Sequence, residues 1–192
     1  MSVQKARSVE INRHSFNVAE YERMGRAGIF SPEARVELVY GEIIEMSPIG
    51  ERHAACVNVL DEIVRGRLGR SVTVSVQNPV LLDDFSAPQP DLLILKRRAD
   101  FYRHAHPRPE DVLVVVEVSD STLELDRTVK MPLYAGAGIP EAWLVNIPDE
   151  RIEVYSDPVG GEYQTARSYA RGRRLQSHTL ASLRLSVSKV LG

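Results

Sequence analysis

Cysteine is almost absent from this chain, and so is any leading apolar segment. Cys56 is the only cysteine among 192 residues, so no disulfide can form within the chain, which fits a reducing compartment. The segment from Met1 to Arg13 is polar and charged and has no apolar stretch of the kind that directs secretion. We therefore expect a cytoplasmic protein in which Cys56 is a small helix residue rather than a nucleophile.

Long hydrophobic runs and an excess of one charge are also missing. No run approaches the roughly 20 apolar residues that a membrane helix needs, so we expect no membrane partner. The net charge of −2 excludes a generic binder of polyanions. With 43% hydrophobic and 26% charged residues, the composition is that of a soluble globular protein. The length predicts a tail over residues 1–14 and a single domain over residues 15–192.

Lysine is scarce, because only four of the 24 basic residues are lysines: Lys5, Lys96, Lys130 and Lys189. The planar guanidinium of arginine suits bidentate recognition of phosphate, but a high arginine content can equally reflect genome composition. Both interpretations stay open. A lysine in the middle of this chain is a rare event, which makes Lys130 a candidate for a specific role.

The order of the predicted elements is typical of an α/β domain with a mixed central sheet, flanking helices and extra hairpins. The apolar runs 91–95 and 112–118 are typical of central strands that are covered on both faces. Alternation around Tyr40-Gly41 predicts a hairpin. Further strands are predicted over residues 141–146, 151–157 and 162–170.

Three helices are expected around this sheet. Ser15 is the predicted cap of the first helix, and residues 51–69 carry the apolar spacing of an amphipathic helix. The third helix follows Glu117 and ends near Gly136 or Gly138. Pro132 lies within it, so we expect a kink there or a regular part that starts about one turn earlier.

Two carboxylates accompany the central strands. Asp91 opens the first run, directly after a proline, and Glu117 lies near the end of the second. A buried carboxylate without a partner costs several kcal/mol or takes up a proton, so Glu117 needs a partner. If the two strands are neighbours, the carboxylates meet at one edge of the sheet, where their hard oxygen donors suit Mg²⁺ or Mn²⁺.

These residues also have simpler interpretations. Asp after Pro is a common turn pair, and Glu117 could pair with Arg127 instead of a metal. Asp126 and Lys130 are four residues apart, which suits an exposed helix salt bridge worth about 0.3 to 0.5 kcal/mol. Lys130 together with Tyr134 would likewise fit a solvated helix face.

Several stretches resemble a known family. Asp91 after a proline and Glu117 in an aliphatic strand are similar to the core motif of the PD-(D/E)XK nuclease superfamily. More closely, "VELVYGEIIEMSPIGERH", "QPDLLIL" and "EVSDSTLELDRTVKMPLYAGAGIPEAWLVN" resemble the Uma-two-type restriction endonuclease family. The resemblance runs from about Ser15 to Tyr155, and its last block is highly specific.

This resemblance implies a restriction-endonuclease-like fold and metal-dependent hydrolysis of phosphodiester bonds. Carried over by position, Glu37, Asp91 and Glu117 are the acidic residues and Lys130 is the catalytic lysine. The superfamily has its lysine two residues beyond the glutamate, where this chain has Ser119, so Lys130 on the following helix takes that role. Asp126 and Tyr134 belong to the same block, and His53 is expected as a hydrogen-bonded core histidine that supports the site.

The primary interpretation is a Mg²⁺-dependent DNA endonuclease that acts as a homodimer. Asp91, Glu117 and the backbone carbonyl of Val118 would hold the metal, while Glu37 would complete the acidic cluster or bind a second ion. Lys130, expected to be exposed and to contribute little to stability, would stabilise the transition state. Contacts with backbone phosphates are expected from the long polar connection between the central strands: Arg97, Arg98, Arg103 and His104.

The alternative is a catalytically silent module that keeps the nuclease fold and binds nucleic acid or another partner. Such a module would have the same sheet but would bind no divalent metal. A glycoside hydrolase with two carboxylates fits less well, because that chemistry does not call for a lysine.

Overall fold

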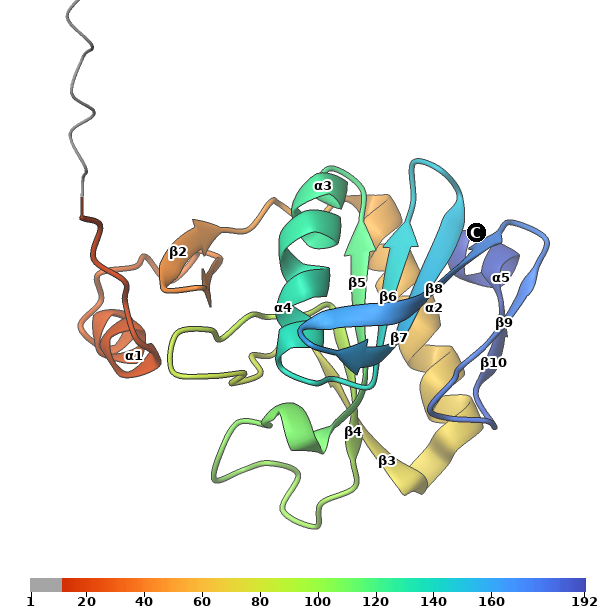
Figure 1. Cartoon of the computed structure of the whole chain (residues 1–192), viewed down its shortest axis with the longest axis horizontal. Coiled ribbons are helices and arrows are strands. Elements are labelled where there is room, and N and C mark those ends of the chain that lie inside the picture. The colour runs from red at the N-terminus through yellow and green to blue at the C-terminus, as the bar shows by residue number, and fades with distance from the viewer. Residues whose placement is uncertain (1–11) are drawn as a thin grey trace, which may run out of the picture.

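A computed structural model describes residues 12–192, which form a mixed α/β fold around a six-stranded sheet (Figure 1). Within it, only the pairing of β5 with β6 is parallel, and this pair is joined by the helical segment that crosses over the sheet. The predicted fold class is confirmed. In spatial order the strands are β3 (Val72–Val76), β4 (Leu92–Lys96), β5 (Val112–Ser119), β6 (Glu141–Asn146), β7 (Arg151–Val159) and β8 (Glu162–Ala170).

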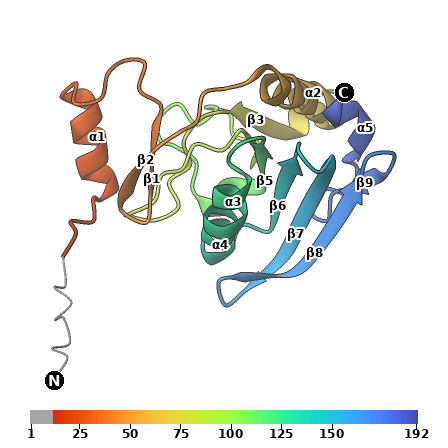
Figure 2. The same ribbon diagram turned by 90° about the horizontal axis from the view of Figure 1, so that it is seen from above.

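Helices cover both faces of this sheet (Figure 2). On one face α2 (Glu51–Leu68) and α5 (Val187–Leu191) pack against a cluster that includes Val116 and Trp143. On the other face α4 (Met131–Gly136) packs against a cluster that includes Val115. Because successive strand residues point to opposite faces, the aliphatic run of β5 supplies both cores at once.

The N-terminal part stands beside the main sheet (Figures 1 and 2) and consists of α1 (Val18–Arg26) and the hairpin of β1 (Val36–Val39) with β2 (Glu42–Glu45). The expected cap at Ser15 is wrong. Asn17 caps α1 in a capping box with Glu20, two residues further along the chain. The predicted tail over residues 1–14 lies outside the described residues, apart from residues 12–14.

Short elements complete the described chain, in which no helix is both long and apolar enough to cross a membrane. A second small sheet pairs two strands near the C-terminus with each other in an antiparallel arrangement. These elements are β9 (Arg174–Gln176), β10 (Arg184–Ser186) and the 3₁₀ turns η1 (Gly69–Ser71) and η2 (Pro109–Asp111).

The helix that follows β5 is widened in its middle. It starts as α3 (Leu123–Leu125), passes through a π-helical turn, η3 (Asp126–Lys130), and continues as α4. The N–H of Met131 donates to the carbonyl of Asp126, five residues back, immediately before Pro132, which has no N–H. The irregularity expected near Pro132 is therefore a π turn, and it spans both Asp126 and Lys130.

A tight turn closes the β1–β2 hairpin as predicted. Tyr40 and Gly41 have φ values of 51° and 77°, the pair of positive angles that a type I′ turn requires. A Cβ atom on Gly41 would lie 2.8 Å from Cβ of Ser15. Both the backbone conformation and the close approach therefore require glycine here, and this hairpin carries Glu37.

Gly41→Ala should destabilise the protein by about 1–2 kcal/mol or more, because the left-handed conformation penalises a Cβ atom and Ser15 must move. The matched control is Gly25→Ala in α1, where the added Cβ meets no atom within 4 Å and the helix should gain about 0.5–1 kcal/mol. Denaturant unfolding measures both. Equal stability of the two variants would contradict the assignment of the turn.

Candidate active site

The end of the sheet brings Asp91 and Glu117 together, as the sequence predicted for neighbouring strands. Strands β4 and β5 are antiparallel, so the start of one lies beside the end of the other, and Leu92 is paired with Val116. Asp91 directly precedes β4, and its Oδ2 accepts a 2.8 Å hydrogen bond from the N–H of Val118. The Asp91 carboxylate is thereby attached to the backbone next to Glu117.

Asp91 is also held by side chains from two other elements. Its Oδ1 lies 3.0 Å from Nε2 of His53, in the first turn of α2, and 3.3 Å from Nε2 of Gln77, just after β3. Within residues 12–192 the other ring nitrogen of His53, Nδ1, is buried without a hydrogen-bond partner. Nε2 is the ring nitrogen that donates to Asp91, because a carboxylate can only accept. His53 is a supporting residue of the site, and Gln77 had no signal in the sequence.

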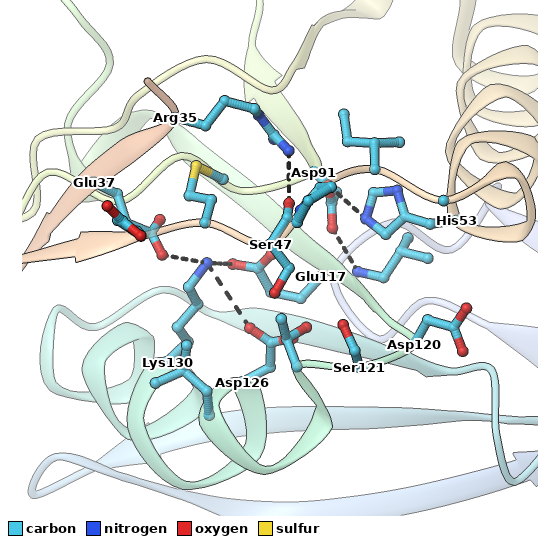
Figure 3. A pocket seen from close by; sticks show the side chains of 18 residues that line it. Arg35, Glu37, Ser47, His53, Asp91, Glu117, Asp120, Ser121, Asp126 and Lys130 are labelled. Atoms are coloured by element: carbon cyan, nitrogen blue, oxygen red, sulfur yellow. Dashed lines mark hydrogen bonds and ion pairs between the residues drawn. The ribbon is translucent and has the colours of Figure 1, made fainter. Parts of the chain in front are cut away.

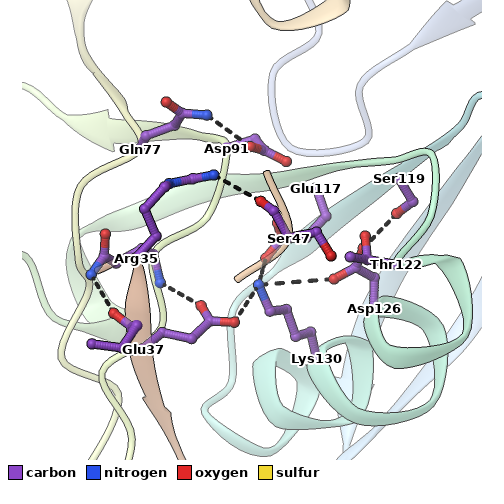
Figure 4. Close-up of polar contacts among 12 residues, drawn as sticks. Arg35, Glu37, Ser47, Gln77, Asp91, Glu117, Ser119, Thr122, Asp126 and Lys130 are labelled. Carbon is purple, nitrogen blue, oxygen red and sulfur yellow. Dashed lines mark hydrogen bonds and ion pairs between the residues drawn. The ribbon is translucent and has the colours of Figure 1, made fainter. Parts of the chain in front are cut away.

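Lys130 lies at the centre of the carboxylates (Figure 4). Its Nζ is 2.9 Å from Oε1 of Glu37, 3.3 Å from Oε1 of Glu117 and 3.8 Å from Oδ1 of Asp126. The Lys130 residue is only 5% exposed. The expectation of an exposed Lys130 was wrong, and so was the alternative of a solvated Asp126–Lys130 pair, because both side chains are buried.

Among residues 12–192, two side chains contact the Glu117 carboxylate, and neither of them is Arg127. Tyr134, fully buried on α4, donates a 2.5 Å hydrogen bond to Oε1, the oxygen that also contacts Lys130. The other carboxylate oxygen of Glu117, Oε2, takes part in neither contact. Arg127 instead binds Glu153 on β7, which removes the simpler interpretation of Glu117.

Burial and mutual repulsion set the protonation of this cluster. Burial raises the pKa of the Glu117 carboxyl well above its ordinary value, and Lys130 only partly offsets that effect. Burial likewise raises the pKa of Asp126. Burial alone would lower the pKa of the Lys130 ammonium, but Glu117, Glu37 and Asp126 raise it above its ordinary value. Lys130 therefore stays charged at neutral pH and can donate hydrogen bonds but not accept a proton.

Ser119 takes part in the cluster although it is not a lysine. It lies two residues beyond Glu117 and therefore on the same face of β5. Its hydroxyl donates a 2.6 Å hydrogen bond to Oδ2 of Asp126, as does the hydroxyl of Thr122. Asp126 is thus oriented by the residue that stands at the superfamily's lysine position. The alternation of β5 could have predicted the location of Ser119 but not its partner.

Glu37 reaches the site from the N-terminal hairpin. It is buried, and its two oxygens have different partners: Oε1 contacts Lys130, and Oε2 accepts a 3.0 Å hydrogen bond from the N–H of Gln89. Its place in β1, outside the main sheet, explains why the tight turn at Gly41 matters for the site.

The side chains surround a pocket of about 240 Å³ (Figure 3). Glu37, Asp91, Glu117 and Lys130 line it, and Arg35 on its rim donates a 2.9 Å hydrogen bond to the carbonyl of Ser47. In the part of the chain that the structure describes, no three His, Cys, Asp or Glu side chains converge closely enough to hold a metal ion by themselves. A metal here would need waters or substrate oxygens as further ligands.

The residues expected to contact phosphates lie elsewhere. Arg97, Arg98, Arg103 and His104 follow Lys96, at the opposite end of β4 from Asp91. Arg97 stacks over the ring of Phe101 at 4.0 Å, and Arg98 forms a 2.9 Å ion pair with Asp100. The structure does not bring these four residues to the pocket, and their contact with nucleic acid stays a prediction.

The mixed sheet, its flanking helices and the acidic residues around one lysine define a protein of the restriction-endonuclease-like class. A family model described as "Uma2: Putative restriction endonuclease" matches residues 18–188, so the chain belongs to the Uma2 family. This confirms the resemblance seen in the sequence. The family match covers all the site residues named above, but it assigns no role to any of them.

A solved structure agrees with the fold. It is described as "a putative nuclease belonging to DUF820 from Anabaena variabilis ATCC 29413", and the superposition has a TM-score of 0.70 at 14% identity. The similarity covers 92% of this chain and 97% of the other. No curated protein matches the chain. At this identity the similarity concerns the fold alone.

Lys130→Met should destabilise the metal-free protein by about 3–5 kcal/mol at pH 8, because it leaves buried carboxylates without their counter-ion. The loss should shrink in acid, where the carboxylates take up protons. Lys189→Met is the control, since that lysine is exposed and its 3.3 Å pair with Glu62 is worth about 0–1 kcal/mol. Urea unfolding at both pH values provides the comparison, and equal losses for the two lysines would disprove the buried network.

Without metal, Glu117→Gln should melt at a higher temperature than the wild type, and the difference should be larger at pH 8 than at pH 4.5. A carboxyl whose folded pKa is raised contributes stability that is fully present below its ordinary pKa of 4.5 and is lost as the pH rises. The variant cannot lose that contribution, so its advantage over the wild type should grow with pH.

Glu153→Gln provides the control of opposite sign. Although burial opposes them, hydrogen bonds from Arg127, Tyr155 and Asn146 lower the pKa of Glu153. Its stabilising contribution is therefore present above pH 4.5 and lost in acid, so this variant should lose stability at pH 8 and approach the wild type at low pH. The same pH trend in both variants would contradict the raised pKa of Glu117.

Proposed function

We propose that the protein is a divalent-metal-dependent nuclease that hydrolyses phosphodiester bonds in DNA. Membership of the Uma2 family supports the nuclease part. The observation that carries the proposal is the meeting of Asp91 and Glu117 at one end of the sheet, with the Lys130 ammonium 3.3 Å from Glu117. Two carboxylates and one cation around a pocket of about 240 Å³ are the groups that phosphoryl chemistry needs.

The donor set fits Mg²⁺ or Mn²⁺. Asp91 and Glu117 offer hard carboxylate oxygens, and the carbonyl of Val118 is the proposed third protein ligand. Mg²⁺ usually accepts one or two protein carboxylates and takes its remaining ligands from water and phosphate oxygens. When bound, the metal would polarise the scissile phosphate and lower the pKa of a water. A nearby cation would also favour the charged form of Glu117.

The other residues of the site would act through charge and position. Lys130 stays an ammonium, so its proposed role is to stabilise negative charge that develops on the phosphate or to orient the attacking water, rather than to remove a proton. Glu37 and Asp126 position that ammonium from the hairpin and from the π turn. His53 and Tyr134 orient Asp91 and Glu117 respectively.

A catalytically silent module that binds nucleic acid is the alternative function. The geometry gives it one supporting fact, since Lys130 already neutralises the carboxylates without a metal. This module would show no heat of Mg²⁺ binding at the site. The homodimer and the cytoplasmic location expected from the sequence also stay predictions, and the mass in solution would test the first of them.

Calorimetric titration with Mg²⁺ and Mn²⁺, followed by incubation with plasmid DNA, tests the proposal. Wild-type protein should bind metal and cut, whereas Asp91→Asn and Glu117→Gln should bind metal weakly and cut at least 100-fold more slowly, because each removes an oxygen ligand. The control is Glu124→Gln, an exposed acid of α3 that does not line the pocket. Wild-type protein that binds neither metal would refute the proposal in favour of the silent module.

A further inference from the structure

A second cavity is lined by residues of the C-terminal half of α2, of β9 and β10, and of α5. Figure 1 shows α5, β9 and β10 on the side of the main sheet away from the N-terminal hairpin. The volume of this cavity is about 550 Å³, more than twice that of the pocket around Lys130. Four of the nine residues that line it are basic, and one is acidic. The residues that matter here are Arg67, Arg174, Arg184, Lys189, Glu62 and Gly66, and we call this cavity the basic groove.

The strand register directs two of these arginines to the same side. Arg174 is paired with Ser186 and Arg184 with Gln176, so the two arginines are diagonal neighbours, roughly 7–8 Å apart at the backbone. Leu175 is buried between two exposed neighbours, which shows that the arginines point away from the core. Arg67 joins them from the last turn of α2.

The charge of the basic groove is not neutralised from within the described chain. Within residues 12–192, Arg67, Arg174 and Arg184 form no ion pair, whereas Lys189 lies 3.3 Å from Glu62, the one acid that lines the groove. The feature of the groove is that three such arginines line one cavity, because many other surface arginines also lack a carboxylate partner within residues 12–192. Three guanidinium groups are left facing one cavity, and guanidinium is the side-chain group best suited to bidentate phosphate binding.

A glycine in the wall of the groove is a second, independent observation. Gly66 lies in the interior of the 18-residue helix α2, where glycine is less favourable than alanine. Neither reason that usually requires glycine applies, because its φ is not positive and an added Cβ would meet no atom within 4 Å. Gly66 adds no side chain to this wall of the groove, and the space beside it is large enough for a Cβ atom.

We propose that the basic groove binds phosphates of the nucleic-acid backbone, away from the bond that is cut. The choice of nucleic acid as ligand rests on the proposed function, whereas the anion-binding chemistry does not. Helix α2 connects the two sites, since His53 of the candidate active site and Arg67 are 14 residues apart. At 1.5 Å per residue this is about 21 Å, or roughly six base pairs of duplex.

A binding assay with a fluorescent 30-base-pair duplex tests the proposal. Fluorescence anisotropy measures the binding, and EDTA is present so that no cleavage occurs. The triple variant Arg67→Gln, Arg174→Gln, Arg184→Gln should lower the slope of log affinity against log salt by about 2.7, since each phosphate contact contributes about 0.9. At 0.1 M salt its affinity should fall on the order of 100-fold. The control triple Arg13→Gln, Arg23→Gln, Arg151→Gln removes the same charge from residues that line neither cavity.

Two variants of Gly66 separate shape from charge. Gly66→Phe fills the groove without changing its charge and should weaken duplex binding, whereas Gly66→Ala should bind as the wild type does and melt at a higher temperature. Melting curves of all variants show whether each one is folded. A duplex that ends fewer than about six base pairs from the cut bond should not reach the groove. The groove triple and the wild type should therefore bind such a duplex with equal affinity.

The outcomes are distinguishable from those of the proposed function. Equal affinity and slope for the groove triple and the control triple would overturn the basic groove, even if the wild type cuts DNA. Groove-dependent binding by a protein that never cuts would keep the groove and refute the nuclease. If the groove triple bound phosphatidylserine vesicles less tightly than the wild type but bound the duplex equally well, the groove would be assigned to a membrane surface and the proposal would be overturned.

Discussion

The buried ammonium of Lys130 is the interaction on which the site and the packing around it depend. It contacts carboxylates from three separate parts of the chain: Glu37 on the N-terminal hairpin, Glu117 on the central strand and Asp126 on the π turn. Carboxylates so deeply buried would be strongly unfavourable without a cation, because each would lose its hydration without compensation. One lysine side chain therefore attaches the hairpin, the sheet and the crossover helix to one another. The π turn contains both Asp126 and Lys130, which makes the local widening of this helix part of the same arrangement.

The same charges connect stability with the proposed chemistry. A metal ion at Glu117, if bound as proposed, would compete with the ammonium for a carboxylate whose charged form is disfavoured by burial, so metal binding would be linked to proton release and to the position of Lys130. Asp91 differs, because a backbone N–H and two side chains from α2 and β3 orient it independently of Lys130. Helix α2 contributes at both of its ends, since its first turn orients Asp91 and its last turns form one wall of the basic groove. A nucleic acid that follows this helix would meet the carboxylates proposed to bind a metal at one end, and at the other the guanidinium groups that have no ion pair within residues 12–192.

Patterns in the sequence predicted much of this arrangement. Two continuous apolar runs identified the central strands, and the carboxylates beside them were correctly expected to meet, because the partner of a buried strand is usually its neighbour in sequence. The alternation of apolar and polar residues around Tyr40-Gly41 predicted the hairpin, and the structure confirms it. Sequence reasoning failed where the partner of a side chain had to be known. Lys130 was expected to be exposed, and Arg127 was considered as a partner for Glu117, since spacing along a helix does not show which face meets a neighbouring element. The basic groove was missed for the same reason: Arg67 is more than 100 positions from Arg174 and Arg184.

The sequence by itself determined the elements, the family and the set of acidic and basic residues, because these depend on local periodicity, turn chemistry and short motifs. Only the tertiary structure decided which of those residues form ion pairs with one another, which are buried and which remain charged. It paired Lys130 with three carboxylates, gave Arg127 to Glu153 and placed Ser119 against Asp126. The physical reason is that the cost of burying a charge depends on all neighbours within a few ångströms, and those neighbours come from segments that are distant in the chain.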